Sequence, residues 1–187
     1  MQQSGESKRA VFLDRDGVIN RVLLKNGIPH PPKKIWELEI ISGVKEAVSI
    51  LRGAGYELIV VTNQPDITRG TLSREDLGEL HRKIADETGL EYFFSCVHDD
   101  QDNCDCRKPK PGLLLKAARE MKLDLRRSFL VGDRWKDIQA GQEAGCSCFF
   151  IDYGYKEQSP SKPFSSVASL YEVALLILEK NDDYADK

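Results

Sequence analysis

The sequence lacks any apolar run that approaches the roughly 18 residues needed to cross a membrane. Residues 1–9 also lack the apolar stretch of a secretory signal peptide, and we interpret them as a flexible tail. We therefore expect a cytoplasmic protein without a membrane partner. Disulfides are rare in that compartment, so the five cysteines of the chain require another explanation.

An excess of positive charge is also missing. The 27 lysines and arginines face 30 aspartates and glutamates, and the resulting net charge of −3 argues against a nucleic-acid partner. The length of 187 residues is enough for one domain with a real core. We expect a monomer with a single domain over residues 10–180, a second flexible tail over 181–187, and a small molecule as its partner.

Short apolar runs alternate along the chain with segments of helical periodicity. The strand candidates are 10–13, 58–61, 92–97, 128–131 and 148–151. Apolar residues recur at helical spacing in the segments 44–51, 73–84, 114–121, 135–144 and 170–177. This alternation predicts an α/β fold, with a parallel sheet of about five strands and helices on both of its faces.

The segment 21–42 fits neither pattern. Pro29, Pro31 and Pro32 exclude a regular helix there, and the segment is too short for a separate domain. We interpret it as a mobile flap that leaves the loop after the first strand.

Polar residues follow several of the apolar runs where each run ends. The group comprises Asp14, Asp16, Thr62, Asn63, Lys108 and Asp133. Because the carboxyl ends of parallel strands meet at one edge of a sheet, we expect these side chains to converge. Carboxylates are hard oxygen ligands for Mg²⁺, while a hydroxyl and an ammonium group suit a phosphoryl group. Phosphoryl transfer requires little more than such positioning and charge neutralisation.

Asp14 and Asp16 are close enough to repel each other unless a cation or a shared proton relieves them. They therefore favour a divalent-metal site in which one carboxylate is also a nucleophile. The alternative for this pair is an acidic turn that ends a strand. Thr62 and Asn63 could likewise be an ordinary helix cap, and Lys108 a solvated loop lysine.

The cysteines of the loop 96–111 form the pattern C-x-H-x₅-C-x-C. Three thiolates and one imidazole, from Cys96, His98, Cys104 and Cys106, predict a closed tetrahedral Zn²⁺ site with a structural role. The alternative is a set of free surface thiols. Of the remaining residues of these types, Cys146 and Cys148 are expected to be buried small hydrophobic residues, His30 a flap residue and His81 a helix-surface residue.

Four ordered segments resemble the motifs of the haloacid dehalogenase superfamily of phosphatases. They are Val-Phe-Leu-Asp14-Arg-Asp16-Gly, Val-Val-Thr62-Asn63, Lys108-Pro and Val-Gly-Asp133-Arg-Trp-Lys-Asp137, all within residues 10–151. The resemblance implies a Rossmann-like sheet. The superfamily inserts its cap domains after the first motif or between the second and third. Both stretches are short here, so we expect a capless enzyme with a zinc loop.

The resemblance also implies roles for individual residues. Asp14 would be the nucleophile and form an aspartyl-phosphate. Asp16 would be the general acid for the leaving alcohol and then the general base for the hydrolytic water. Mg²⁺ would be held by the Asp14 carboxylate, the Asp16 backbone carbonyl and Asp133. Asp137 would orient Lys108 or a metal-bound water.

The zinc loop narrows the resemblance to two groups of phosphatases within the superfamily. From Cys96 through Arg107-Lys108-Pro109-Lys-Pro111-Gly112 it is similar to the loop of the D-glycero-D-manno-heptose 1,7-bisphosphate 7-phosphatases, and also to that of the histidinol-phosphate phosphatases. The heptose enzymes usually have Ser-Gly after Thr-Asn-Gln, whereas this chain has Pro65-Asp66 there.

These features support one main hypothesis and two alternatives. The main hypothesis is a Mg²⁺-dependent phosphatase of a sugar bisphosphate, with a D-glycero-D-manno-heptose 1,7-bisphosphate as the leading substrate and Arg69, Arg107 and Arg134 available for its distal phosphate. The first alternative is a histidinol-phosphate phosphatase, whose amine-bearing substrate would favour an acidic neighbour such as Asp66. The second is an inactive zinc-stabilised binding module. The candidate phosphate- and substrate-binding residues are Thr62, Asn63, Arg69, Arg107, Lys108 and Arg134.

Overall fold

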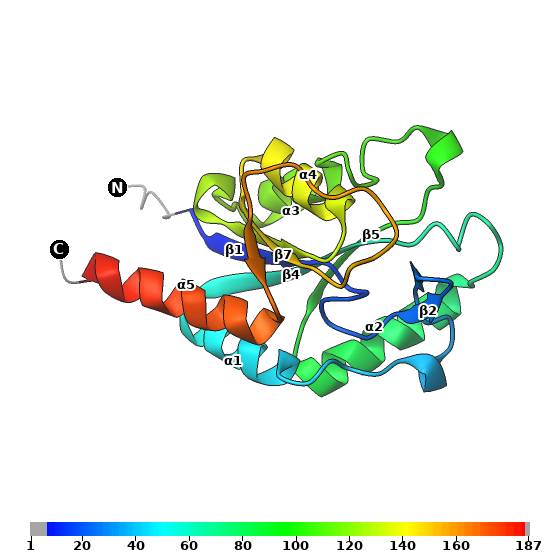
Figure 1. The fold of residues 1–187 in the computed structure, drawn as a ribbon, viewed down its shortest axis with the longest axis horizontal. Helices are drawn as coiled ribbons and strands as arrows, with labels where there is room; N and C mark the ends of the chain where they lie inside the picture. Colours follow the sequence, from blue (N-terminus) through cyan, green and yellow to red (C-terminus); the bar gives the residue numbers. More distant parts are fainter. Residues whose placement is uncertain (1–6, 186–187) are drawn as a thin grey trace.

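The computed structural model describes residues 7–185 and contains a six-stranded parallel sheet with helices on both faces (Figure 1). The strand order is β5-β4-β1-β6-β7-β8. The strands are β1 (Arg9–Leu13), β4 (Tyr56–Asn63), β5 (Tyr92–Cys96), β6 (Phe129–Gly132), β7 (Ser147–Ile151) and β8 (Ser165–Val167). The α/β architecture and the five expected strands are confirmed, and β8 is an additional short strand at the edge of the sheet.

The helices within residues 7–185 lie in two layers (Figure 1). One face of the sheet carries α1 (Val44–Gly53), α2 (Arg74–Thr88) and α5 (Leu170–Ala185); the other carries α3 (Gly112–Met121) and α4 (Trp135–Ala144). Successive residues of β1 alternate between the two apolar layers: Val11 and Leu13 pack on the α1 side, Ala10 and Phe12 on the α3 side. A strand that is buried on both faces explains the continuous apolar run.

The position of β1 in the sheet determines where the polar residues gather. This strand is paired on one side with β4 and on the other with β6, and Leu13 lies opposite both Val60 and Val131. The three strands therefore end side by side. Asp14 is the next residue, and its backbone N–H donates to the Val131 carbonyl at 3.0 Å.

The flap segment 21–42 contains a small antiparallel hairpin instead of a helix. Its strands are β2 (Leu23–Lys25) and β3 (Ile28–His30), followed by the 3₁₀ turn η1 (Ile35–Glu37). Lys33 of the flap forms a 3.0 Å ion pair with Asp66, which ties the flap to the loop after β4. The described chain contains no inserted cap domain, in agreement with the capless fold expected from the sequence.

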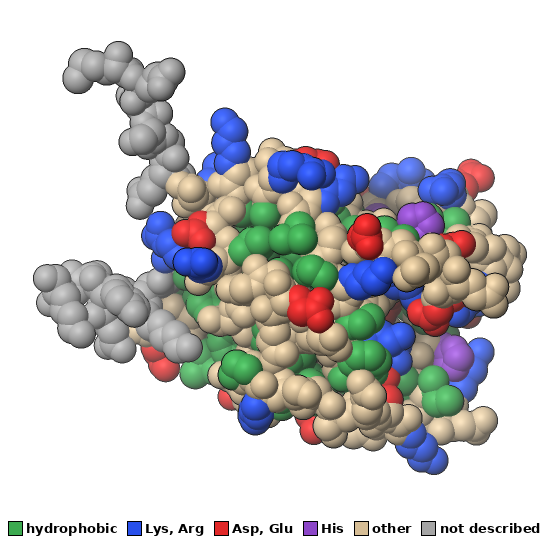
Figure 2. Space-filling view, turned by 90° about the horizontal axis from the view of Figure 1, so that it is seen from above, with side chains coloured by type: hydrophobic (Ala, Val, Ile, Leu, Met, Phe, Trp, Pro, Cys, Tyr) green, Lys and Arg blue, Asp and Glu red, His purple; other side chains and the backbone are tan. Residues whose placement is uncertain are grey.

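The ends of the folded part extend slightly beyond the expected domain. Lys8 bridges to Leu123, Arg9 already belongs to β1, and α5 continues to Ala185 instead of ending near residue 180. Residues 1–6 and 186–187 of the expected tails lie outside the described part. No helix in residues 7–185 has the length and apolar character that a membrane crossing requires. On the face shown in Figure 2, acidic and basic side chains are interspersed.

Candidate active site

Four charged side chains converge where β1 and β6 end. The Lys108 ammonium lies 2.7 Å from Asp14 Oδ1 and 2.6 Å from Asp137 Oδ1, and it donates a further hydrogen bond to the Val61 carbonyl at 2.8 Å. Asp133 completes the group, since carboxylate oxygens of Asp14, Asp133 and Asp137 lie within 4.8 Å of one another. All four side chains are buried.

The electrostatics of this cluster are dominated by burial. Burial raises the pKa of Asp14 to about 7; Lys108 opposes this shift, whereas Asp137 and Asp16 reinforce it. Burial, together with Asp14 and Asp137, also raises the pKa of Asp133. Burial alone would lower the pKa of Lys108, but the two adjacent carboxylates outweigh it and raise that pKa, so the lysine stays charged. A cation among these carboxylates would balance their excess negative charge.

Asp133 has the surroundings of a metal ligand. Both of its carboxylate oxygens are buried, and neither has a hydrogen-bond partner among residues 7–185. The Tyr155 hydroxyl influences its pKa but lies outside hydrogen-bonding geometry. A Cβ on Gly17, whose φ is +96°, would lie only 1.9 Å from Asp133 Oδ2, so glycine is needed for the Asp14 loop to approach this carboxylate. Buried carboxylate oxygens without donors suit a hard cation such as Mg²⁺.

Asp16 makes a separate set of contacts. Its Oδ1 accepts hydrogen bonds from Arg15 Nε and Asn20 Nδ2, both at 3.0 Å, and its Oδ2 accepts one from Gln64 Nε2 at 2.9 Å. Gln64 Nε2 also donates to Thr62 Oγ1 at 2.9 Å. The carboxylate of Asp16 is thus fixed by three neighbours, while the predicted magnesium contact of this residue concerns its backbone carbonyl.

Asn63 supports Lys108 directly. Its side-chain amide donates to the Lys108 carbonyl at 2.9 Å and accepts from the Lys108 backbone N–H at 3.0 Å. These two reciprocal bonds connect the end of β4 to the loop that carries the lysine. The Asn63 side chain therefore fixes the position of the Lys108 backbone.

The three arginines considered for a distal phosphate all form ion pairs. Arg69 pairs with Asp99, Arg107 with Asp100, and Arg134 with Glu157. The bidentate Arg69 contact, with two N–O distances of 2.6 Å, lowers the pKa of Asp99 to about 2. Arg107 donates through Nε to Asp100 at 2.7 Å and through Nη1 to the His98 carbonyl at 3.3 Å. A distal phosphate would have to share each arginine with its carboxylate partner, or replace that carboxylate.

One cavity of about 330 Å³ joins these groups. Its wall contains all the residues expected from the sequence for catalysis, magnesium and phosphate: Asp14, Asp16, Thr62, Asn63, Arg69, Arg107, Lys108, Asp133, Arg134 and Asp137. The flap contributes Val22 and the run Ile28 to Pro31. The structure thus places the catalytic candidates and the flap around a single small-molecule-sized space.

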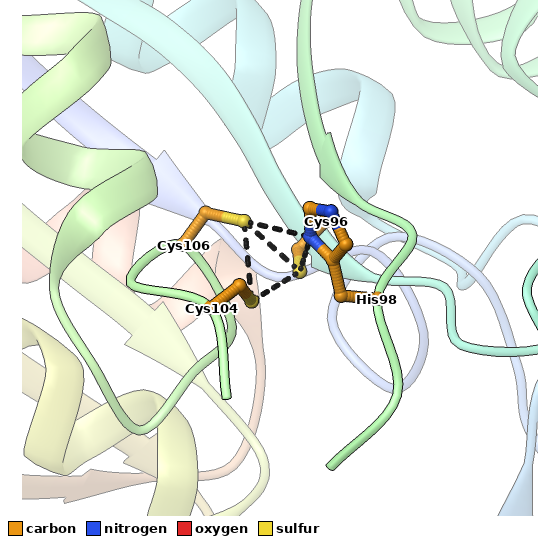
Figure 3. Close-up of side chains that lie close together, drawn as sticks. All are labelled: Cys96, His98, Cys104 and Cys106. Atoms are coloured by element: carbon orange, nitrogen blue, oxygen red, sulfur yellow. Dashed lines mark hydrogen bonds between the residues drawn. The ribbon is translucent and has the colours of Figure 1, made fainter. Parts of the chain in front are cut away.

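The four expected zinc ligands form a second cluster (Figure 3). Sulfur–sulfur distances among Cys96, Cys104 and Cys106 are 3.2–3.6 Å, and His98 Nδ1 lies 3.5 Å from Cys96 Sγ and 3.3 Å from Cys106 Sγ. A tetrahedral ion with Zn–S bonds of about 2.3 Å places its sulfur ligands about 3.8 Å apart, so the donor set and spacing fit a metal ion. Cys96 is the last residue of β5, His98 lies between β5 and the 3₁₀ turn η2 (Asp100–Asp102), and Cys104 and Cys106 follow η2.

The zinc loop is packed closely against the start of α3. A Cβ on Gly112 would lie 2.2 Å from the Asp105 carbonyl, so only glycine allows the helix to begin there. Arg107 and Lys108 follow the last thiol, Cys106, directly. The cysteine and histidine cluster is therefore separated from the two cations by no more than one residue, and its position helps to set theirs.

The comparisons with known proteins agree with this geometry. Residues 33–145 match the family model described as haloacid dehalogenase-like hydrolase. The chain belongs to this family of hydrolases. One curated relative of the hydrolase is a D-glycero-beta-D-manno-heptose-1,7-bisphosphate 7-phosphatase of Pasteurella multocida; it is 38% identical over 73% of this chain and 77% of the relative. Another is a D-glycero-alpha-D-manno-heptose-1,7-bisphosphate 7-phosphatase of Photorhabdus laumondii; it is 32% identical over 90% of this chain and 96% of the relative.

A solved structure extends the similarity to three dimensions. The D,D-heptose 1,7-bisphosphate phosphatase from B. bronchiseptica, crystallised with magnesium and phosphate, superimposes on the hydrolase with a TM-score of 0.79 and 29% identity. The match covers 92% of this chain and 99% of that structure. The haloacid dehalogenase fold expected from the four motifs is thereby confirmed.

The site of this hydrolase also contains residues that the motifs did not reveal. Arg15, Asn20 and Gln64 surround Asp16, and Lys136 lines the cavity. The expectation that His81 faces solvent on its helix is wrong: its ring stacks on Phe93, and its Nε2 lies 3.5 Å from Arg15 Nη1. Cys146 and Cys148 are buried, as expected.

Proposed function

We propose that this hydrolase removes one phosphate from a sugar bisphosphate, with a heptose 1,7-bisphosphate hydrolysed at position 7 as the best candidate. The main support is the arrangement of one cavity that has the Asp14–Lys108 pair in its wall together with three arginines. Two phosphates on one small molecule match one reaction centre and three guanidinium groups in the wall of the same cavity. The names of the heptose bisphosphate phosphatases among its relatives support the same substrate class.

In the proposed reaction, an Asp14 carboxylate oxygen attacks phosphorus and the bond from phosphorus to the sugar oxygen breaks. Asp16 gives its proton to that oxygen as the alcohol leaves. Water then attacks the aspartyl-phosphate and loses a proton to Asp16, which releases inorganic phosphate and restores the Asp14 carboxylate. Lys108, held by Asp137 and Asn63, orients Asp14 and neutralises the equatorial oxygens.

The proposed metal ions have different tasks. Mg²⁺, held by Asp14, Asp133 and the Asp16 backbone carbonyl, would neutralise charge on the phosphoryl group. Zn²⁺, held by the four ligands of the zinc loop, would keep the loop in one conformation. Burial and hydrogen bonding raise the pKa of the Cys96 thiol, so metal binding has to displace a proton there.

The structure gives less support to the histidinol-phosphate alternative. That hypothesis depends on Asp66 as an acidic neighbour for a substrate amine. Asp66 is instead paired with Lys33 at 3.0 Å, and Arg69 lies 3.9 Å away. Two cations already compensate this carboxylate, so it offers little net attraction to an ammonium group.

Arg107→Ala tests the bisphosphate assignment. We expect kcat/KM for the heptose bisphosphate to fall by about 100-fold, because a bidentate guanidinium contact to the distal phosphate is lost. The value for 4-nitrophenyl phosphate should fall by less than about threefold, since that substrate has no distal group. Lys110→Ala is the matched control, because Lys110 belongs to the same loop but does not line the cavity, and its ammonium group pairs with Asn103 and Asp105. An equal loss for both substrates would contradict the distal role of Arg107.

The metal assignment predicts two separable requirements. Freshly purified protein should contain about one Zn²⁺ per chain by elemental analysis, and turnover should depend on added Mg²⁺. Cys104→Ser should lower both zinc content and activity, although Cys104 touches no substrate. A zinc-free but fully active preparation would contradict the structural role of the loop. Zinc without any Mg²⁺-dependent hydrolysis, even of 4-nitrophenyl phosphate, would favour the inactive binding module.

The raised pKa of Asp14 predicts a pH-dependent stability. This group binds its proton more tightly in the folded protein than in the unfolded chain, so its contribution to stability is fully present at low pH and is lost as pH rises through about 7. Without Mg²⁺, the free energy of unfolding should fall by about 1 kcal/mol between about pH 6 and about pH 8. Added Mg²⁺ should flatten this dependence, because it stabilises the charged carboxylates. Urea titrations in both buffers measure the effect, and a profile that rises with pH and ignores Mg²⁺ would contradict it.

A further inference from the structure

Arg15 is a buried cation that the proposed reaction does not use. It lies between Asp14 and Asp16 in the chain, has no exposed surface, and does not line the cavity. Its guanidinium contacts the Asp16 carboxylate through Nε at 3.0 Å and through Nη2 at 2.9 Å. A buried guanidinium is costly unless its partners are well placed, so this contact fixes both groups strongly.

The Arg15 guanidinium also contacts a histidine. His81 of α2 places Nε2 at 3.5 Å from Arg15 Nη1, and its ring stacks on Phe93 of β5 with centroids 4.6 Å apart. Burial, followed by the charge of Arg15, lowers the pKa of His81 to about 4. The ring is therefore neutral at physiological pH, and its unprotonated Nε2 accepts from the arginine.

We propose that Arg15 and His81 are positioning residues for Asp16: α2 and β5 hold the imidazole, the imidazole orients the guanidinium, and the guanidinium sets the Asp16 carboxylate in the geometry needed for proton transfer. This inference rests on the proposed role of Asp16 as the general acid. Neither Arg15 nor His81 lines the cavity, so both act through Asp16 and not on the substrate. Asn20 and Gln64 bind the same carboxylate from other directions and complete its support.

A defect in a general acid has a kinetic signature that a general loss of folded protein does not share. Alkoxide leaving groups require protonation, whereas 4-nitrophenolate leaves without it. The parameter kcat/KM reports only the steps up to release of the alcohol, so the later action of Asp16 as a base does not enter. A misplaced Asp16 must therefore lower kcat/KM more for poor leaving groups than for good ones.

His81→Phe tests the inference, because the ring and its stacking on Phe93 are kept while the acceptor is removed. We expect kcat/KM for the sugar bisphosphate to fall by about 10- to 100-fold, and for 4-nitrophenyl phosphate by less than about threefold. His81→Gln, whose amide oxygen can accept from Arg15, should restore most of the loss. Arg15→Lys should show the same selective defect, and Asp16→Asn should show it at its limit.

Arg82→Gln is the control, since Arg82 is the next residue of α2 and is exposed. Circular dichroism and zinc content establish that each variant is folded. Equal losses for both leaving groups, or no recovery with His81→Gln, would overturn the inference while leaving the proposed function intact. A wild-type protein that hydrolyses no phosphomonoester would overturn the proposed function, and this inference with it.

Discussion

Asp14→Asn is expected to abolish turnover while the fold stays intact. An amide is neither anionic nor a comparable nucleophile, so no aspartyl-phosphate can form, and kcat should fall by ~10⁴-fold or more. Release of inorganic phosphate from the sugar bisphosphate and from 4-nitrophenyl phosphate, both with Mg²⁺, measures the loss. Unlike the variants that disturb Asp16, this one should affect both substrates equally, because the attacking atom itself is removed.

The interpretation of Asp14→Asn depends on two controls. Asparagine can deamidate to aspartate, so mass spectrometry must exclude restored Asp14. Zinc content should stay unchanged, since the cysteine cluster does not contact Asp14. The folded state should not suffer in Mg²⁺-free buffer, because burial already disfavours the charged form of this side chain. Activity close to wild type in undeamidated protein would refute the nucleophile assignment.

The fold and the charged cluster were predictable because their signals are local. The run Ala10 to Leu13 is apolar because β1 is buried on both faces, and the polar residues that follow must lie at the sheet edge. The cluster of three cysteines and one histidine was similarly predictable, since its four residues lie between positions 96 and 106 of the chain. In each case a few neighbouring residues determine both the local structure and the functional groups of the site.

The contacts that the sequence did not reveal join residues far apart in the chain. His81 reads as a surface residue within α2, and only the tertiary fold brings it to Arg15, 66 positions away. The ion pair between Arg134 and Glu157 likewise depends on the path of the loop after β7. The strand β8 contains three residues, Ser165–Val167, too few to show a period.

Lys108→Met is expected to damage both stability and activity. Lys108 forms ion pairs with Asp14 and Asp137 beside Asp133, and removing it takes away the positive charge that compensates these buried carboxylates. Loss of one partner of a buried ion pair typically costs about 3–5 kcal/mol. The equatorial oxygens of the transferring phosphate also lose their counter-charge, so kcat/KM should fall by about 10²- to 10³-fold. Urea unfolding and phosphate release measure the two effects.

The effect of Lys108→Met should depend on the remaining carboxylates, which distinguishes charge from packing. Adding Asp137→Asn should recover part of the lost stability, because one uncompensated charge is removed, whereas activity should stay low. Added Mg²⁺ should stabilise the variant more than the wild type, since it would replace the positive charge that Lys108 supplies to Asp14. Lys110→Met, two residues away and only partly buried, should change stability by less than about 0.5 kcal/mol. If Lys108→Met and Lys110→Met were equally stable, the ammonium group would not be what holds these carboxylates together.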